Sequence, residues 1–565
     1  MIRDGSLVAH SEEERFTRFK GSHFAFPTRS MTWMLKDNGL TFDDIDAVAW
    51  SWDQSLYRVE MPLFFLKNYL RHGLGRPGSG QGITKVTSHV LDNLPGHVRS
   101  RIRSELVASG VRGEVPPIHF LPHHLCHAAS SFYMSGFEHS NVVVIDGSGE
   151  QHCTSLYAAD ANGIEELEHV SIPNSLGWYY AAVTEHLGFI PYRDEGKVMG
   201  LAAYGRPSLE LTRKLAQVLT IRDDTYSVDP GYTLLGEHRF GRHFSDALVD
   251  LLGPPRPYEA PLEPRHQDIA FAAQHLLEQA AGAVVRRVQK LRPDGHLCLA
   301  GGVTLNCKMN GFLRRAPGVE RLFVQPSAND AGSALGAALL FAQQRGALRS
   351  HTLRHTYYGS GYDDDQIEAK LKNSRLGYSR PADIHATVGQ SLGEGKIVGV
   401  YQGRAEFGAR ALGNRSILAN PLIKDARNQV NGRVKFREPW RPLCPSIMDE
   451  FRDRYMRDAC DAPFMAVAFE VREEWTDLLS AVVHTDGTIR PQTVTKQQNE
   501  FLWRCIDAFR SITGHAIVMN TSFNVRGQPI VESPGDAIAC FFATGLDALA
   551  IGPFWLEKRP GTPAA

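Results

Sequence analysis

The chain has 565 residues, of which 43% are hydrophobic and 22% are charged, and its formal net charge is −1. This composition excludes a disordered or fibrous protein, and the charge gives no global attraction to nucleic acid or to an anionic membrane. The longest apolar stretches are interrupted before they reach the roughly 20 residues of a membrane span. The N-terminus lacks a signal-peptide core and the cysteines form no CxxC pair, so we expect a cytoplasmic protein with reduced thiols.

The first part of the chain alternates predicted strands with predicted helices, which is typical of an α/β protein. A turn at Asp4–Gly5 precedes what looks like the second arm of a hairpin, and we expect the first arm to be missing. A short strand follows at 46–50, and a helix is predicted to open near Pro122. The segment SNVVVIDGSGE predicts a buried strand that ends at Asp146 and a glycine turn.

Later segments repeat the strand–turn–helix pattern. GHLCLAGGVTLNCKMN predicts a strand, a Gly-Gly turn and a helix, and LFVQPSANDAGSALGAALLFAQQ predicts a strand, a loop and a helix of small residues. Apolar periodicity is lost over 343–362, so we predict one domain at 1–350 and a second at 351–565. The second domain contains strand–loop segments around GRAEFGARALGNRS and VMNTSFN.

Histidines at positions 123 and 127 could share one face of a helix and reach the same metal ion. A bare HxxxH pattern has a more common structural interpretation, in which the rings cap a helix or bond to the backbone. Asp146 and Asp330 change this balance because each is predicted to end an apolar strand. Two histidines and two carboxylates can together close a site for zinc or ferrous iron.

Two glycine-containing segments suit anion binding and have equally good structural interpretations. Lys197, in DEGKVMGLAAYG, could contact a phosphate or carboxylate, or could be an exposed lysine in a turn. In GGVTLN, the backbone amides of Gly301 and Gly302, with Asn306, could cradle a nucleotide. The same glycines could instead allow a strand and a helix to pack closely.

Basic residues are concentrated between positions 404 and 441, where they alternate with glycine, proline and apolar residues. We interpret this cluster as a convergent anion pocket rather than a solvated basic face, since arginine and lysine recognise phosphate and carboxylate. Arg490, Asn520 and Ser522 add groups that could orient a planar amide or a phosphate. A Walker A loop is absent, so ATP would not bind by the P-loop route. The cluster comprises Arg404, Arg410, Arg415, Lys435, Arg437 and Arg441.

Taken in order, these segments closely resemble the O-carbamoyltransferase family, which includes tobramycin, cephalosporin, novobiocin and geldanamycin carbamoyltransferases and the nodulation protein NodU. The segments that carry the resemblance span nearly the whole chain, and include EEERFTRFK, HHLCHAASSF, EGKVMGLAAYG, NDAGSALGAA, EFGARALGNRSILANP, VKFREPWRPLCPS and NTSFNVRGQPI. The resemblance implies an actin-like, sugar-kinase-like N-terminal domain. It also implies an α/β C-terminal domain similar to the threonylcarbamoyl-adenylate synthase fold.

The resemblance further implies an ATP-dependent reaction in two steps. Carbamoyl phosphate and ATP would form carbamoyl adenylate in the second domain, and the carbamoyl group would pass to a hydroxyl of a small-molecule natural product in the first. The implied metal is Fe²⁺ or another divalent ion, with His123, His127, Asp146 and Asp330 as ligands. The implied catalytic residues are Arg410, Lys435 and Lys197. The implied cofactor-binding residues are Gly301, Gly302, Asn306, Arg410, Lys435, Arg441, Arg490, Asn520 and Ser522.

One feature departs from the family pattern, and two other functions stay open. Family members begin with a histidine-bearing loop that does not precede IRDGSL here, so we expect weakened transfer with adenylate formation less affected. A tRNA threonylcarbamoyladenosine-type enzyme is disfavoured by the net charge of −1. A non-catalytic actin-like nucleotide-binding protein would leave the basic pocket unexplained. We expect neither a nucleic-acid nor a membrane partner, and no motif indicates the acceptor or the oligomeric state.

Overall fold

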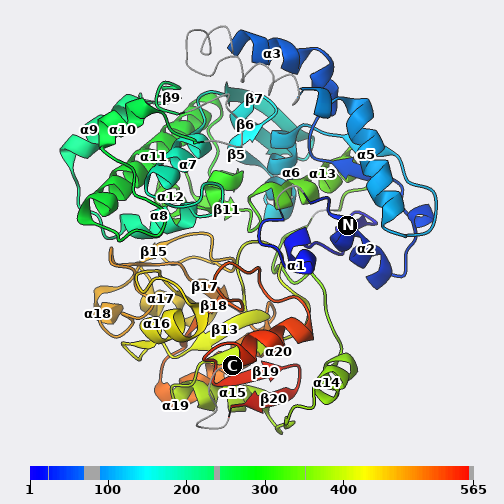
Figure 1. The fold of residues 1–565 in the computed structure, drawn as a ribbon, viewed down its shortest axis with the longest axis vertical. Coiled ribbons are helices and arrows are strands. Elements are labelled where there is room, and N and C mark those ends of the chain that lie inside the picture. The colour runs from blue at the N-terminus through cyan, green and yellow to red at the C-terminus, as the bar shows by residue number, and fades with distance from the viewer. Residues whose placement is uncertain (23–24, 69–89, 234–241, 350, 559–565) are drawn as a thin grey trace. The chain divides into compact units, whose positions relative to one another are not determined.

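The computed structural model describes the chain except for 23–24, 69–89, 234–241, 350 and 559–565 (Figure 1). It divides into two compact units. Unit 1 comprises Met1–Leu7 and Met31–Thr352, and unit 2 comprises Val8–Ser30 and Leu353–Ala565. The segment Val8–Ser30 therefore groups with the C-terminal half, whereas the predicted division placed all of 1–350 in the first domain.

The core of unit 1 is a five-stranded sheet in the order β11–β10–β5–β6–β7. Strands β10 and β11 run parallel to β5, and β6 and β7 extend the sheet with antiparallel pairing. The apolar run Val142–Ile145 in β5 is fully buried, as expected of a strand covered on both faces. The strands are β5 (Ser140–Gly149), β6 (His152–Asp160), β7 (Gly163–Ser171), β10 (His296–Ala300) and β11 (Arg321–Val324).

Helices cover both faces of this sheet (Figure 1). Val142 and Val144 pack with Phe132 of α6 (His123–Ser135). Because alternate side chains of a strand point to opposite faces, Val143 faces the other side, where α7 and α11 contact β5. Helix α13 packs along α6, and α8 and α12 pack along α11. The bounds are α7 (Leu176–His186), α8 (Glu195–Ala202), α11 (Pro264–Leu291), α12 (Cys307–Leu313) and α13 (Asp330–Gln344).

Unit 2 is built on a seven-stranded mixed sheet in the order β17–β14–β18–β13–β12–β19–β20. One face carries an apolar core with α15 and α19, and a second core contains residues of α14 and α20. The strands are β12 (Val398–Tyr401), β13 (Arg415–Ala419), β14 (Cys444–Met448), β17 (Gln492–Val494), β18 (Ile517–Ser522), β19 (Ala548–Ile551) and β20 (Phe554–Glu557). The helices are α14 (Asp364–Asn373), α15 (Ile384–Gly393), α19 (Glu500–Thr513) and α20 (Pro534–Phe542). The predicted α/β class is confirmed in both units.

The predicted turn at Asp4–Gly5 joins β1 (Ile2–Arg3) to β2 (Ser6–Leu7), so a short first arm is present where we expected none. The other elements are α1 (Glu13–Thr17), α2 (Thr28–Asp37), β3 (Val48–Trp50), α3 (Glu60–Asn68), α5 (Pro95–Ala108), β4 (Ile118–Phe120), α9 (Leu209–Val218), β8 (Leu219–Ile221), β9 (Tyr226–Val228), α10 (Asp246–Leu252), α16 (Ala426–Gln429), α17 (Arg452–Tyr455), β15 (Phe469–Glu470), α18 (Glu473–Thr476) and β16 (Thr488–Ile489). A π-helical turn covers Val430–Lys435.

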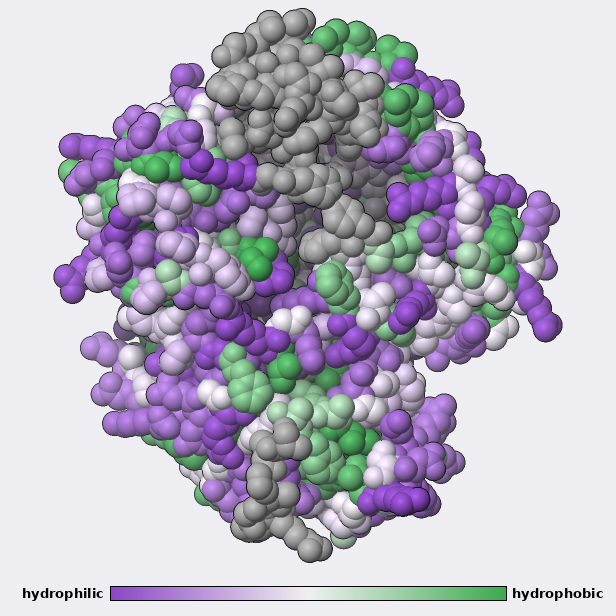
Figure 2. All heavy atoms as spheres, viewed as in Figure 1, coloured by the Kyte–Doolittle hydropathy of each residue, from purple (hydrophilic) through white to green (hydrophobic). Residues whose placement is uncertain are grey.

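The exposed surface is mixed in character. The face drawn in Figure 2 is largely hydrophilic, with smaller hydrophobic areas between the charged side chains. Within the described residues, no helix has the length and apolar character that crossing a membrane requires.

Candidate functional site

Unit 1 brings four potential metal ligands together at the start of α6. The helix follows β4 and opens at His123, with Pro122 as its N-cap residue, as the sequence predicts. His123 and His127 lie one turn apart, so both rings project from one face of the helix. Both side chains are buried.

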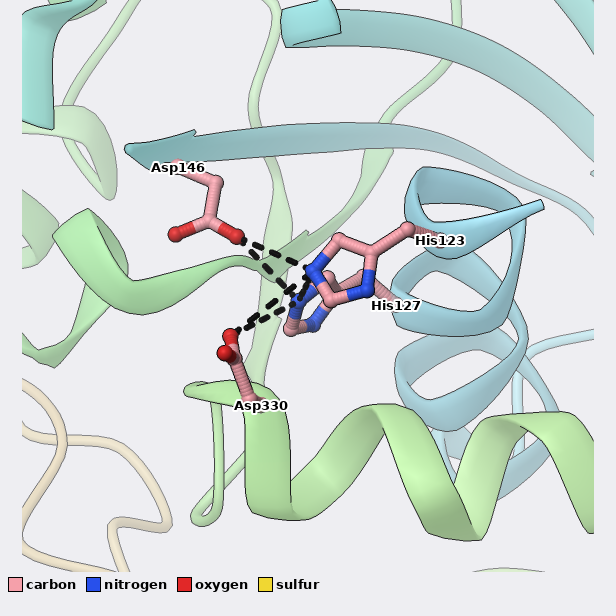
Figure 3. A group of neighbouring side chains, drawn as sticks. All are labelled: His123, His127, Asp146 and Asp330. Atoms are coloured by element: carbon pink, nitrogen blue, oxygen red, sulfur yellow. Dashed lines mark hydrogen bonds and ion pairs between the residues drawn. The ribbon is translucent and has the colours of Figure 1, made fainter. Parts of the chain in front are cut away.

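Two aspartates meet these rings from different elements (Figure 3). Asp146 lies in β5 where its pairing with β6 shifts register between Ile145 and Gly149, an irregularity that can redirect a side chain. Asp330 is the first residue of α13 rather than the end of a strand. Its side chain is 79% exposed whereas that of Asp146 is 10% exposed, so the group is buried on one side and open at Asp330.

The four side chains have the spacing of a tetrahedral site. The Nε2 atoms of the two histidines are 3.1 Å apart, and they lie 3.4 Å and 3.3 Å from Oδ2 of Asp146. Oδ1 of Asp330 lies 3.7 Å and 3.8 Å from the same two nitrogens. Ligand atoms bound about 2.1 Å from a tetrahedral ion would be separated by about 3.4 Å. Mixed imidazole and carboxylate donors suit Zn²⁺ or Fe²⁺, so these residues fit the metal that the family resemblance implies.

Neighbouring groups orient these potential ligands. Nδ1 of His123 lies 2.8 Å from the carbonyl oxygen of Ser51, which leaves Nε2 of this ring to face the aspartates. Oδ1 of Asp146 accepts hydrogen bonds from the backbone N–H groups of Gly147 and Gly302, at 2.8 Å and 3.1 Å. Glu150 accepts the backbone N–H of His123 at 3.1 Å and so anchors the start of the helix.

The charges of this group are strongly coupled. Burial disfavours a protonated His123, but its hydrogen bond with Asp146 and the charge of Asp330 outweigh burial and raise its pKa to about 9. Burial also disfavours ionised Asp146, yet the two histidines hold the pKa of its carboxyl well below the usual range. Without a metal, the site therefore favours a cationic imidazole beside a carboxylate.

The other residues predicted in unit 1 have structural contacts. Lys197 is buried in α8, where its Nζ donates to Asp194 at 3.0 Å and lies over the Phe189 ring, so it is not an exposed lysine in a turn. Asn306 caps α12 by accepting the N–H of Met309, and its amide donates to Gln274. Its role in binding a nucleotide stays a prediction.

The Gly-Gly turn contacts Asp146, one of the four potential metal ligands. Gly301 has φ +91°, and a Cβ there would lie 2.3 Å from the carbonyl oxygen of Ile145, so only glycine fits. Gly302 then donates its N–H to Asp146. This turn therefore has a defined role in holding Asp146, and its predicted role as a nucleotide cradle stays untested.

In unit 2, Lys435 lies near other basic residues, among them Arg437 and Arg441. It is buried, and its Nζ donates to the carbonyl oxygens of Ser522 and Asn524 at 2.7 Å and 2.8 Å, and to Oδ1 of Asn524. Burial, followed by the nearby positive charges of Arg437 and Arg441, lowers the pKa of Lys435 well below its usual value. The oxygens that it contacts are uncharged, so its charge is not neutralised by a carboxylate in these contacts.

Arg490 and Asn520 both contact residues of β14 in the same sheet. Nη2 of Arg490 donates to the sulfur of Cys444 at 2.9 Å, and Cys444 pairs with Asn520 across two strands. The amide nitrogen of Asn520 donates to Ser446 at 2.9 Å and to Gln492 at 3.2 Å. Its Oδ1 atom is buried and has no hydrogen-bond partner among the described residues. A buried acceptor of this kind can receive a ligand N–H.

Two of the arginines that we assigned to the anion pocket have structural contacts instead. Arg415 is fully buried, lies 3.7 Å from the Tyr401 ring centroid, and donates to the backbone carbonyls of Gln402, Ser360 and others. Arg404 donates to the carbonyl oxygens of Gly359 and Tyr358. The sequence shows their charge but not the carbonyl groups that they meet. Arg410 lies in the loop between them and is half-buried.

Sequence reasoning missed several supporting residues. Glu406 is buried, and its Oε1 accepts the backbone N–H groups of Leu412, Asn414 and Arg415 at 2.7–3.2 Å. This carboxylate therefore shapes the loop that carries Arg410. Its position inside EFGARALGNRS could have indicated this role, because a single acidic residue in a basic loop needs partners for its charge. Ser51 acts through a backbone carbonyl, for which the sequence holds no signal.

Comparison with known sequences shows which proteins the chain resembles. A family profile described as Carbamoyltransferase N-terminus matches residues 1–339, and one described as Carbamoyltransferase C-terminus matches 389–558. The chain is 33% identical to Nodulation protein NolNO of Sinorhizobium fredii, over 100% of this chain and 79% of that protein. It is 37% identical to Nodulation protein NolO of Bradyrhizobium diazoefficiens, over 78% of this chain and 79% of that protein.

The name of a third relative states a reaction. The chain is 29% identical to 3'-hydroxymethylcephem-O-carbamoyltransferase of Amycolatopsis lactamdurans, over 65% of this chain and 66% of that protein. Among solved structures, full-length HypF in its phosphate- and nucleotide-bound form covers 44% of this chain and 38% of that one, with 13% identity and a TM-score of 0.26, too low to carry an argument. The two family profiles together span most of the sequence, and the chain belongs to the carbamoyltransferase family of enzymes that transfer carbamoyl groups.

Proposed function

We propose that this enzyme is an ATP-dependent O-carbamoyltransferase that makes carbamoyl adenylate in unit 2 and transfers the carbamoyl group in unit 1. The proposed substrates of unit 2 are carbamoyl phosphate and ATP. The proposed acceptor is a hydroxyl group of a small-molecule natural product, which the cephem O-carbamoyltransferase relative supports.

The observation that carries this proposal is the buried basic group around Lys435. A lysine whose contacts are uncharged oxygens, surrounded by Arg437 and Arg441, is destabilised until an anion arrives. A phosphate dianion would supply the missing negative charge and would accept charge-assisted hydrogen bonds. The same positive charge would stabilise negative charge that develops on the leaving phosphate groups.

Asn520 supports a carbamoyl substrate in particular. Its amide nitrogen is occupied by Ser446 and Gln492, so its free carbonyl oxygen presents an acceptor. A carbamoyl group has an NH₂ that can donate to this oxygen, whereas an acetyl group has none. We assign Asn520 to orientation of the carbamoyl amide, with Ser522 and Arg490 beside it.

The proposed reaction proceeds through three displacements, each with a defined leaving group. Water releases phosphate from carbamoyl phosphate and leaves carbamate. A carbamate oxygen then attacks the α-phosphorus of ATP and pyrophosphate departs, forming carbamoyl adenylate. Arg410, Lys435 and Arg441 would bind and offset the phosphate charges during both displacements. Attack of the acceptor hydroxyl on the carbamoyl carbon finally releases AMP.

We assign the transfer step to unit 1. His123, His127, Asp146 and Asp330 would hold a divalent metal ion, proposed to be Fe²⁺, which when bound supplies Lewis-acid charge for phosphate oxygens. The open side at Asp330 leaves room for a ligand. The sheet order and mixed strand directions support the actin-like description of this unit. Lys197, Gly301, Gly302 and Asn306 are proposed to border the adenylate.

Pyrophosphate release tests the proposal. The protein is incubated with ATP and divalent metal, with and without carbamoyl phosphate, and pyrophosphate is measured with a coupled assay. We expect release only with carbamoyl phosphate, and a carbamoylated product by mass spectrometry when a suitable hydroxyl compound is added. Pyrophosphate release that does not depend on carbamoyl phosphate would contradict the adenylation step. Pyrophosphate release that needs bicarbonate and threonine would favour the tRNA-modifying alternative.

A further inference from the structure

The segment Val8–Ser30 contacts Gly408, which lies in the loop of unit 2 that carries Arg410. Oε1 of Glu12 accepts the backbone N–H of Gly408 at 2.5 Å, and Nη2 of Arg15 donates to the carbonyl oxygen of Gly408 at 2.9 Å. Glu12 and Arg15 also form an ion pair with each other at 3.4 Å. Both polar groups of one peptide residue are therefore held by a single acid–base pair.

This pair is shielded from water. The side chains of Arg15 and Glu12 are only 3% and 14% exposed, so their hydrogen bonds to the backbone are stronger than they would be at the surface. The segment is anchored a second time by Arg18, which donates to the carbonyl oxygens of Ile530 and Pro529 at 2.6 Å and 3.1 Å. Contacts with two separate loops hold α1 against the rest of unit 2.

Gly408 lies two residues before Arg410, in a conformation with φ +91° that favours glycine. On the other side of Arg410, the N–H of Leu412 is held by Glu406 and its carbonyl oxygen accepts from Gln492 at 2.7 Å. Gln492 in turn accepts from the amide of Asn520. The short stretch that carries Arg410 is therefore fixed at both ends, and one end joins the network of Asn520.

We propose that Glu12 and Arg15 are positioning residues for Arg410, which they hold in the anion site of unit 2 through the Gly408 peptide. This inference rests on the proposed function, since Arg410 is assigned there to the phosphate site. It also gives EEERF a role that charge and spacing alone do not indicate. Displacement of a catalytic group by about 1 Å costs on the order of 100-fold in rate.

A double-mutant cycle tests the proposal. Glu12→Ala is compared with Glu13→Ala, a matched control in which the lost carboxylate contacts Arg29 and Ser30 rather than Gly408. We expect Glu12→Ala to weaken inorganic phosphate binding and to raise the KM for carbamoyl phosphate by about 10–100-fold. In an Arg410→Ala background the same change should have little further effect, because the two residues act through one group.

Further measurements separate positioning from folding. Arg15→Lys should recover part of what Arg15→Met loses, since a lysine can still donate to the Gly408 carbonyl. The proposal would be overturned if the loss of phosphate affinity in Glu12→Ala added fully to that of Arg410→Ala. It would also be overturned if Glu13→Ala lost as much affinity as Glu12→Ala. Phosphate binding is measured by calorimetry and needs no turnover. The positioning role of Glu12 and Arg15 can therefore be supported even if the wild-type protein shows no carbamoyl-phosphate-dependent release of pyrophosphate.

Discussion

The Nε2 atoms of His123 and His127 face each other at 3.1 Å. Two neutral imidazoles cannot both direct lone pairs at one another at this distance, so a proton or a metal ion must lie between them and Asp146. The Ser51 carbonyl holds the N–H of His123 on the opposite ring nitrogen. The ring is thereby oriented in advance for a cation at Nε2.

Replacing His127 with alanine should therefore abolish stoichiometric metal binding. The ligand set falls to three, and the Asp146 carboxylate loses one of its two imidazole neighbours. We expect affinity to fall by more than the roughly 10–100-fold that loss of a supporting residue costs. Titration calorimetry and metal analysis of the purified protein measure this. His275→Ala, an exposed histidine on α11 of the same unit, is the control and should bind metal normally. Retention of full affinity by His127→Ala would exclude it as a ligand.

Anion binding in unit 2 should take up a proton at Lys435. Burial lowers the pKa of this lysine in the free protein, and a bound dianion favours the ammonium form and raises it again. The complex then holds more protons than the free protein, so affinity should fall as pH rises toward the ordinary lysine value of about 10.4. Sulfate is the suitable ligand because it does not titrate in this range.

Calorimetry in buffers with different heats of ionisation measures that proton. We expect uptake of part of a proton by the wild type and none by Lys435→Met. The same uptake in Lys435→Met would show that another group is responsible.

Much of the fold could be predicted because local patterns decide it. The continuous apolar run Val142–Ile145 predicted a buried strand, and the helix at Pro122 and the turn at Asp4–Gly5 followed from residue type. The membership of Val8–Ser30 in unit 2 could not be predicted, since it depends on contacts such as that of Arg18 with Ile530, far apart in sequence.

The candidate site divides in the same way. The spacing of His123 and His127 on a helix is a local property, so the sequence indicated a shared face. The role of each arginine was harder to predict. Arg404, Arg410 and Arg415 lie in one Gly- and Arg-rich segment, but Arg415 and Arg404 donate to backbone carbonyls. Sequence shows which side chains are charged, and only packing decides which charges remain for a ligand.

Removing the free acceptor of Asn520 should weaken carbamoyl phosphate binding specifically. The Asn520→Ala change loses one hydrogen bond to the carbamoyl NH₂, worth about 1–3 kcal/mol in a buried site, or roughly 5–150-fold in KM. The KM for ATP should change little. Steady-state pyrophosphate release measures both constants, and Asn428→Ala, a helix residue whose amide contacts Asp425, is the control. A parallel rise in both KM values would argue against orientation of the carbamoyl group by Asn520.

Neutralising Glu406 should destabilise the loop that carries Arg410. Its carboxylate accepts three backbone N–H groups in a buried position, and charge-assisted bonds of this kind are about twice as strong as neutral ones. We expect Glu406→Gln to lower the free energy of unfolding by about 1–3 kcal/mol, measured by urea denaturation. Glu394→Gln removes a surface ion pair with Lys396 and should cost much less, because water screens an exposed pair. Equal losses in the two variants would mean that the carboxylate of Glu406 is not needed to hold the loop.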